Sequence, residues 1–262
     1  MARYFRLLAV QLRASALLAL QYRWDFLVDG VISLFFTGTA LVPLFVVFSD
    51  RPTVAGWSIG EALVVTGWFT LLQGIIEGAI NPSLTTVVDH IRKGTLDFVL
   101  LKPADAQFLV STSRFALWRV TSVLMGLVIF GIAFTRLDRW PTVTGILQAL
   151  LLVTLAIAVL YSLWILIVSL AFYVVKVDNL TYLFTSIFDA ARWPVSVFRG
   201  LLRFLFTFVI PLALMTTYPA EALLGRLKPV TLVASVGCAV LFAAVARAVW
   251  LRSIGRYTSA SS

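Results

Sequence analysis

The sequence predicts an all-α polytopic membrane protein with six transmembrane helices. Hydrophobic residues make up 61% of the 262 residues and charged residues only 13%, so a soluble fold would expose far more apolar surface than water tolerates. Apolar stretches long enough to cross about 30 Å of hydrocarbon recur along the chain. Most tryptophans lie near the ends of those stretches, where indole rings prefer the membrane interface.

The first segment, residues 2–21, is expected to form an amphipathic helix in the headgroup region. Phe5, Leu8 and Leu12 recur about one helical turn apart, and arginines lie among them. Arg13 interrupts the apolar run, and no clear small-x-small cleavage site follows it, so the segment does not resemble a cleaved signal peptide. We expect it to be retained as an interfacial helix that leads into the first span.

Six apolar stretches follow, each long enough for a transmembrane helix. They are residues 26–47, 61–80, 117–134, 144–175, 201–218 and 230–250. Tryptophans near their ends are Trp24, Trp57, Trp118, Trp140, Trp193 and Trp250. The fourth stretch is too long for one perpendicular span, and we expect it to project beyond the bilayer. Pro211 removes a backbone hydrogen bond inside the fifth stretch, which should kink or break into a re-entrant piece near its outer end.

The cations give the orientation. With the N-terminus in the cytoplasm, sixteen Lys and Arg residues fall on the inner side and five on the outer side. Cytoplasmic segments of membrane proteins carry the excess of Lys and Arg. Both termini and the loop between the second and third spans, residues 81–116, are therefore expected to be cytoplasmic. We expect one membrane domain over residues 1–262, because no linker or repeat divides the chain.

The cytoplasmic loop contains the longest polar interruption of the chain. Its first half has the pattern of a short surface helix, with apolar residues on one face, charged residues elsewhere and a glycine at the end. The residues expected to form this surface are Val87, Val88, Asp89, His90, Ile91, Arg92, Lys93, Gly94, Leu96 and Asp97. A compact helix of this kind can dock on a partner and transmit a rigid-body push to the spans beside it.

Two acids lie inside the predicted spans, Asp29 and Glu77. Charged groups in spans are costly and suggest function. Either both acids reach the cytoplasmic interface, where Arg23 or Arg92 could pair with them, or they line a cavity open to the cytoplasm. Glu77 lies within Gly74-Ile-Ile-Glu-Gly78, a spacing that lets another backbone approach closely.

Further polar side chains lie at the same level of the predicted membrane. Gln73, Asn81 and Asn179 fit either a packed gate or a wet boundary. The candidate pathway or gate residues are Asp29, Gln73, Glu77 and Pro211.

Several kinds of chemistry have no support in the sequence. It contains no G-x-x-x-x-G-K-[ST] phosphate loop, so we expect no ATP hydrolysis by this chain alone. His90 is the only histidine and Cys238 the only cysteine, so a catalytic site, a metal site and bound cofactors are not expected. The positive charge is explained by topology, and no nucleic-acid partner is expected. The outer loops are short, so function should lie in the membrane and on its inner face.

The interfacial helix, six spans, amphipathic loop helix and broken fifth span together resemble the ABC-2 type permeases, the membrane subunits of one class of ABC exporters. The run from Gly94 to Pro103 is similar to the G-x-L-D-x-x-L-L-K-P stretch of a poorly characterised branch of that family. The segments 192–198, 206–211 and 218–220 resemble the same branch. In that branch, two related permeases are found with one separate ATPase.

The resemblance implies that residues 87–93 form a coupling helix that docks in a groove of the ATPase. It further implies two ATPase subunits that bind ATP and Mg²⁺, a second identical or paralogous permease, and location in the bacterial inner membrane among its lipids. ATP-driven closure would open a cavity, lined by spans one, two and five, toward the outer leaflet. The apolar interior suits a hydrophobic or amphipathic substrate such as a drug, lipid or lipopeptide.

Three other functions remain open at this stage. A proton-coupled secondary transporter would use Asp29 or Glu77 as the carrier, although no inverted repeat is visible. A membrane-bound lipid-modifying enzyme would need polar catalytic residues at one interface, where His90 and Asp97 are the nearby candidates. A membrane scaffold without transport activity is the third.

Overall fold

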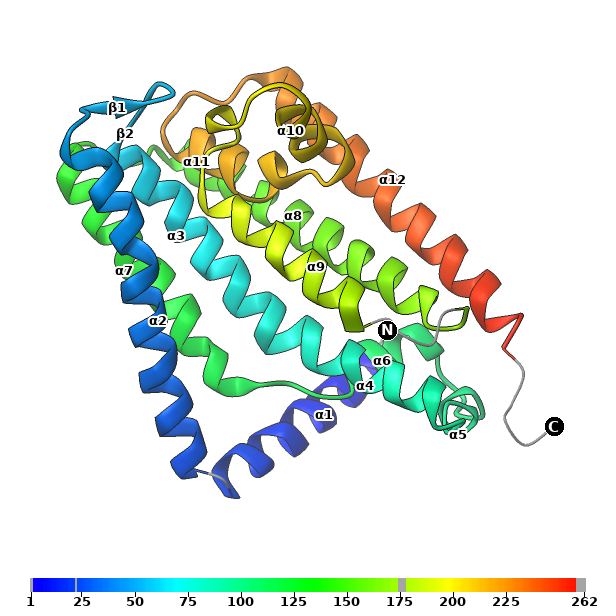
Figure 1. Ribbon diagram of the computed structural model, residues 1–262. Helices are drawn as coiled ribbons and strands as arrows, with labels where there is room; N and C mark the ends of the chain where they lie inside the picture. The colour runs from blue at the N-terminus through cyan, green and yellow to red at the C-terminus, as the bar shows by residue number, and fades with distance from the viewer. Residues whose placement is uncertain (1, 22, 174–177, 258–262) are drawn as a thin grey trace.

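The computed structural model describes residues 2–21, 23–173 and 178–257, which fold into a bundle of long helices (Figure 1). The only strands among these residues form a short antiparallel ribbon, β1 (Thr53–Val54) and β2 (Trp57–Ser58). The predicted all-α class is therefore confirmed.

Five of the described helices are long and apolar enough to cross a membrane, or six if a bent pair of helices counts as one span. The five consist of α2 (Arg23–Ser49), α3 (Ile59–Ile75) with its continuation η1 (Ile76–Ile80) and α4 (Asn81–Arg92), α7 (Val120–Leu137), α8 (Val143–Leu170) and α12 (Pro229–Ile254). They overlap the predicted first, second, third, fourth and sixth stretches.

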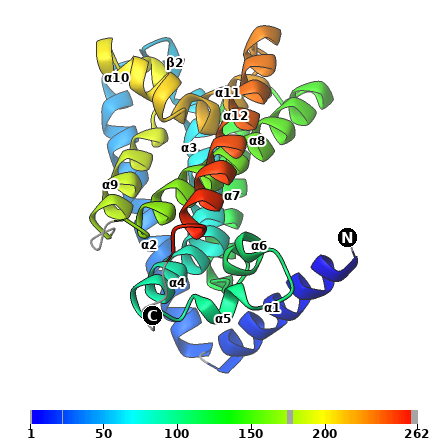
Figure 2. The same cartoon turned by 90° about the vertical axis from the view of Figure 1, so that its right-hand side faces the viewer.

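The N-terminal helix, the loop after α4 and the end of α12 meet at one end of the bundle, which we call the inner end (Figure 2). The elements there include α1 (Ala2–Gln21), α5 (Asp97–Leu100), α6 (Ala106–Ser111) and the 3₁₀ turn η2 (Leu117–Arg119). Arg3 donates to the carbonyl of Pro103, and the Asp105 N–H donates to Tyr4 Oη at 3.3 Å. Arg247 Nη2 pairs with Asp105 Oδ2 at 2.6 Å. These contacts tie both terminal helices to the same loop.

A re-entrant hairpin lies at the opposite, outer end. Its elements are α10 (Gly200–Phe204), η5 (Leu205–Val209), η6 (Ala213–Thr217) and α11 (Tyr218–Leu223), and it follows the short turn η4 (Val195–Val197). Its two limbs meet at 70°, and the predicted break falls around Pro211. Trp57 contacts the chain on both sides of the hairpin: its Nε1 donates to Ser196 Oγ at 3.0 Å, and the Arg226 guanidinium lies 4.7 Å from its ring centroid. The hairpin therefore enters and leaves at the same end of the bundle.

The predicted fifth span, residues 201–218, is consequently wrong. The chain after α8 is at the inner end, where Ser253 Oγ of α12 donates to Tyr173 Oη at 3.4 Å, whereas Ser196 is at the outer end. The crossing between them is made by α9 (Asp178–Phe188) and the 3₁₀ turn η3 (Asp189–Arg192) (Figure 1). This segment is short and carries charged residues, so its composition did not indicate a span.

The corrected topology changes the charge count but not the orientation. Arg199 and Arg203 move to the outer end, and Arg192 lies within the fifth crossing. The bias becomes thirteen inner cations against seven outer ones, which still favours the cytoplasm at the inner end.

The fourth span is shorter than predicted. The α8 helix ends at Leu170 and is followed by a turn through Tyr173, while residues 174 and 175 lie outside the described residues. Its 28 residues measure about 42 Å at 1.5 Å per residue, which still exceeds the hydrocarbon thickness.

The α3 helix is the centre of the bundle: 72% of its span window is buried, against 17% for α2 and for α12. Glycines let it lie very close to α7. A Cβ on Gly126 would lie 2.9 Å from the Gly67 carbonyl oxygen, and one on Gly74 would lie 3.1 Å from the Arg119 carbonyl oxygen. One on Gly78 would meet the Arg119 Cβ at 3.1 Å. The close approach expected at Gly74 and Gly78 is therefore present, with α7 and the turn before it as the neighbour.

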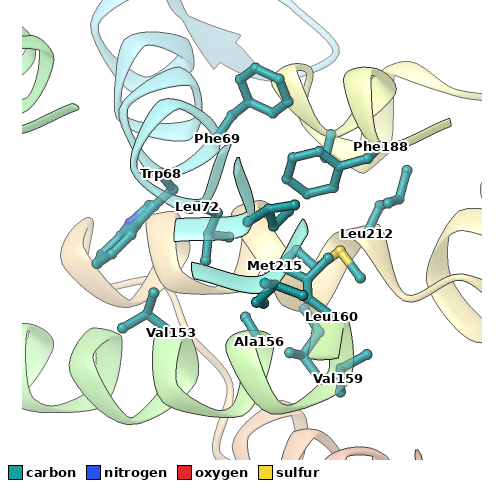
Figure 3. Packing of buried hydrophobic residues seen from close by; sticks show 14 of the residues in the cluster. Trp68, Phe69, Leu72, Val153, Ala156, Val159, Leu160, Phe188, Leu212 and Met215 are labelled. Atoms are coloured by element: carbon teal, nitrogen blue, oxygen red, sulfur yellow. The ribbon is translucent and has the colours of Figure 1, made fainter. Parts of the chain in front are cut away.

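On its other side α3 packs against α8 and the outer hairpin. Figure 3 shows Phe69 and Leu72 of α3 facing Leu160 of α8, Phe188 of α9 and Met215 of η6. Phe69 and Phe188 stack with ring centroids 5.2 Å apart. This packing holds the short fifth crossing in place.

Candidate functional site

The inner-end loop is a compact platform built on α4. Pro82 lies in the first turn of the helix, where a missing N–H is tolerated, and Gly94 follows the last turn with a φ of 66°. The Thr95 N–H donates to the His90 carbonyl at 2.9 Å and the Gly94 N–H to the Ile91 carbonyl at 3.3 Å, the pattern of a Schellman motif. His90 Nδ1 also lies 2.7 Å from Thr95 Oγ1. The helix thus ends at the predicted glycine, and His90 stabilises this end.

The apolar face of α4 is not free to dock on a partner, contrary to expectation. Val87 is 1% exposed and Val88 7%, and both belong to the protein's own core together with Leu84. Ile91 is partly buried against the same core. The face packs inward because α4 lies against α6 and α8, so α4 presents its polar side, including Asp89, Arg92 and Lys93, to the exterior.

The exposed apolar side chains of the loop come from α5 and the residue that follows it. Phe98 is 70% exposed and Leu101 81%, and they lie three residues apart, so they project from the same side of a helical turn. Leu96 beside them is fully buried and anchors the turn. We call Phe98 and Leu101 the loop pair.

The C-terminal segment lies against this loop. The pKa of the Tyr257 phenol is raised by burial and, to a smaller extent, by the negative charge of Asp97. The Tyr257 ring packs edge-on against Phe172, with ring centroids 5.8 Å apart. The predicted coupling residue Asp97 therefore lies near Tyr257.

A polar network ties the loop to α8 and α12. Arg247 of α12 donates to Asp105 and, through Nη1, to Gln107 Oε1 at 2.7 Å. Gln107 Nε2 donates to Tyr161 Oη of α8 at 2.9 Å, and Ser111 Oγ lies 2.7 Å from the same oxygen. The hydrogen bonds from Arg247 lower the pKa of the Asp105 carboxyl, although partial burial acts in the opposite direction.

A second polar cluster lies where α3 passes into α4. Glu77 is in the π-helical turn η1, and its Oε2 pairs with Arg119 Nη1 at 2.6 Å. Gln73 Nε2 donates to Glu77 Oε1 at 3.1 Å, and the Ala116 N–H donates to the Gly78 carbonyl at 2.8 Å. Glu77 is therefore paired with Arg119 and not with Arg92. The Arg23 side chain lies outside the described residues.

A cavity of about 700 Å³ lies between α2, α3, the start of α7 and η3. Along α2 it extends from Asp29 to Pro43, about 21 Å at the helical rise, which is most of the thickness of a hydrocarbon layer. Its hydroxyl side chains are Ser33, Thr37, Thr39, Thr66, Thr70 and Ser122. Its ionisable side chains are Asp29, Arg119, Asp189 and Arg192. We call this cavity the polar groove.

Arg192 is held loosely in the groove. Its guanidinium lies 4.9 Å from the Phe69 ring centroid, and its Nη2 is 3.9 Å from Asp189 Oδ1, a distance too long for a hydrogen bond. Its Nε is buried and has no hydrogen-bond partner among the described residues. An unpaired buried donor is costly.

The predicted pathway residues divide between these sites. Asp29 and Gln73 line the polar groove, whereas Glu77 lies in the cluster with Arg119. Pro211 is buried at the bend of the outer hairpin and does not line the groove. The first two predicted spans line the groove together with the start of α7 and η3, and no residue of the predicted fifth span 201–218 does.

Sequence reasoning missed three charged residues of the groove, Arg119, Asp189 and Arg192. A usable signal was present on α2 and α3. Ser33 and Thr37 are four residues apart, and Thr66, Thr70 and Gln73 follow the same helical spacing, so polar residues form a stripe on each span. A polar stripe on a membrane helix indicates a side that does not face lipid.

The crossings, the re-entrant outer hairpin, the inner loop platform and the polar groove define a multi-pass membrane transport protein. A family model described as ABC-2 family transporter protein matches residues 34–261. The chain therefore belongs to the ABC-2 transporter family, and it is a permease component of an ABC transporter. Neither a curated protein nor a solved structure matches the chain.

Proposed function

We propose that this chain is the membrane subunit of an ATP-driven exporter that moves a hydrophobic or amphipathic molecule, such as a drug, lipid or lipopeptide, out of the cytoplasm or inner leaflet. Separate ATPase subunits bind ATP and Mg²⁺ and dock on the inner-end loop. The location is a bacterial inner membrane.

The observation that carries this proposal is the exposed loop pair on a rigid support. Phe98 and Leu101 are among the most exposed large apolar side chains of the described residues, and they lie on the inner-end loop rather than on a span. Exposed apolar side chains in water favour a protein partner. Asp89 and Lys93 are exposed on the same loop and supply polar contacts at the rim of such an interface.

The connections of the loop allow it to transmit motion. Helix α4 continues α3 through η1, so a push on the loop acts along the most buried helix of the bundle. The pair Glu77–Arg119 and the hydrogen bond from Ala116 to Gly78 join the same turn to the start of α7. A π-helical turn is a common position for a functional irregularity in a helix. Closure of the ATPases would thus move α3 and α7 together against α2, across the polar groove.

The complex requires a second permease, identical or paralogous, because one loop engages one half of an ATPase dimer. Two permeases and two ATPase subunits then form the exporter.

Co-purification with candidate ATPase subunits in detergent tests the proposal. The loop-pair variant carries both Phe98→Asp and Leu101→Asp. Neither substitution changes the buried face of α4. The matched control is Val143→Asp, since Val143 is 74% exposed at the start of α8 on the outer side, where a helix N-terminus tolerates an acid.

The wild type and Val143→Asp should form a complex that hydrolyses ATP, and the loop-pair variant should lose it. Equal complex formation by all three chains would refute the loop pair as the docking site. Transport driven by a proton gradient without any ATPase would refute the proposed ATP-driven exporter and would indicate a secondary transporter.

A further inference from the structure

We infer that a second pocket, at the inner end of the bundle, binds the phosphate group of an anionic lipid headgroup. The pocket has a volume of about 330 Å³. Its described lining comes from η1, the first turn of α4 and the segment 114–119, which leads into α7. We call it the inner pocket. The site would exist whether or not the chain works with an ATPase.

The charge of the inner pocket is positive. The ionisable side chains among its described lining residues are Glu77, Arg114 and Arg119. Arg119 Nη1 lies 2.6 Å from Glu77 Oε2, so these two charges offset each other. Arg114 is exposed, and its guanidinium has no ion pair or hydrogen bond with another described residue. One positive charge of the pocket is therefore unmatched, and an anionic group would neutralise it.

The backbone that carries Arg114 is held firmly. Ser83 of α4 is fully buried, and its Oγ accepts from the Arg114 N–H at 3.0 Å and donates to the Arg114 carbonyl at 2.6 Å. The next two N–H groups of the chain donate to Ser15 Oγ of α1 at 3.1 Å and to the Gly78 carbonyl at 2.8 Å. A side chain on a fixed backbone loses less freedom when it binds a ligand, which favours affinity.

The inner pocket lies at the depth of the headgroups of the cytoplasmic leaflet. Trp118 lines it, and indole rings prefer the membrane interface. The spanning helix α7 begins at Val120, directly after this segment, and the N-terminal helix α1 contacts the segment through Ser15. Basic pockets between helices on the cytoplasmic side are typical sites for anionic headgroups.

The size and charge of the pocket favour one kind of headgroup. Its volume is at the lower end of the range for ligand pockets, about 300–1,000 Å³, so it suits a headgroup whose acyl chains stay in the leaflet. A guanidinium binds phosphate through two parallel hydrogen bonds. The cation of a phosphocholine headgroup would be repelled by Arg114 and Arg119. Phosphoglycerol, which has a net negative charge, is therefore preferred.

Native mass spectrometry of the purified full chain, with lipids added to the same detergent, measures this preference without an ATPase. Two probes, dioleoyl phosphatidylglycerol and dioleoyl phosphatidylcholine, share their acyl chains and differ only in the headgroup. The third probe is glycerol phosphate, which carries the anion without a chain. The wild type should retain phosphatidylglycerol about tenfold more than phosphatidylcholine, the factor of one charge-assisted hydrogen bond.

Arg114→Gln should remove most of this preference. Ser83 contacts Arg114 only through the backbone of Arg114, so the substitution leaves those hydrogen bonds in place. Arg114→Lys keeps the charge but not the paired hydrogen bonds, and it should retain part of the preference. The matched control is Arg252→Gln, which removes an exposed cation at the inner end of α12, outside the pocket, and should behave as wild type.

Equal retention of the two lipids by the wild type would overturn the inference. Equal behaviour of Arg114→Gln and Arg252→Gln would also overturn it, because lipids that only coat the helices respond to net charge and not to the pocket. Retention of glycerol phosphate as strong as that of phosphatidylglycerol would assign the pocket to a soluble phosphate ester instead of a lipid.

Discussion

The contact between α3 and α7 can be tested by a single methyl group at Gly126. A Cβ there would lie 2.9 Å from the Gly67 carbonyl oxygen and 3.1 Å from the backbone nitrogen of Leu71. These are backbone atoms of the most buried helix and cannot rotate away. Gly126→Ala must therefore separate the two helices.

The loss of folding stability expected for Gly126→Ala follows from these short distances. Carbon prefers neighbours at about 3.5–4.0 Å, and forcing an extra methyl group into a packed core costs about 1–3 kcal/mol. Alanine also favours a helix over glycine by roughly 0.8–1.0 kcal/mol. The control Gly131→Ala, in the same helix, has no atom within 4 Å of the added Cβ, so it includes the helix preference without the clash.

Equilibrium unfolding in mixed micelles, followed by tryptophan fluorescence, measures both variants. Gly126→Ala should be less stable than Gly131→Ala by about 1–3 kcal/mol, a ratio of unfolding constants of about 5 to 150. Equal stability of the two variants would show that the helices do not approach as closely as described.

Two further predictions concern the two ends of the bundle. The pKa of Asp105 is lowered in the folded state by Arg247, so this pair stabilises the fold above the unfolded pKa of about 3.9 and the contribution is lost as pH falls through the lower folded pKa. Melting temperatures of wild type and Arg247→Gln should therefore differ most at neutral pH, and the difference should shrink as pH falls below about 4. A residual difference from the lost hydrogen bond to Gln107 should remain, and a difference that does not change with pH would contradict the role of Asp105. At the outer end, Trp57→Phe removes the hydrogen bond to Ser196 and should raise amide exchange in the re-entrant hairpin severalfold. Unchanged exchange there would mean that Trp57 does not hold the hairpin.

The sequence identified the features that depend on composition and local spacing. The membrane class, the Gly94 helix end, the break around Pro211 and the close approach at Gly74 each follow from a few neighbouring residues. These residues act through backbone geometry or transfer from water, which do not require knowledge of distant parts of the chain.

The coupling surface depended on tertiary packing. The spacing of Val87, Val88 and Ile91 identified an apolar face on α4, but periodicity does not distinguish a face that packs on the same chain from one that binds a partner. The structure buries that face and exposes Phe98 and Leu101.

The fifth crossing shows the same limit. The apolar segment 201–218 satisfies the length criterion for a span. However, Trp57 contacts Ser196 before this segment and Arg226 after it, so both ends of the segment lie at the outer end of the bundle. The crossing is made by the shorter, more polar α9 and η3. Phe184 and Phe188 of α9 pack on Trp164 of α8 and Phe69 of α3, whereas Tyr182 and Leu183 stay exposed. A search for a long apolar stretch does not detect a crossing made of an α-helix of 11 residues and a charged 3₁₀ turn. The groove residues Asp189 and Arg192 therefore became visible only in the folded chain.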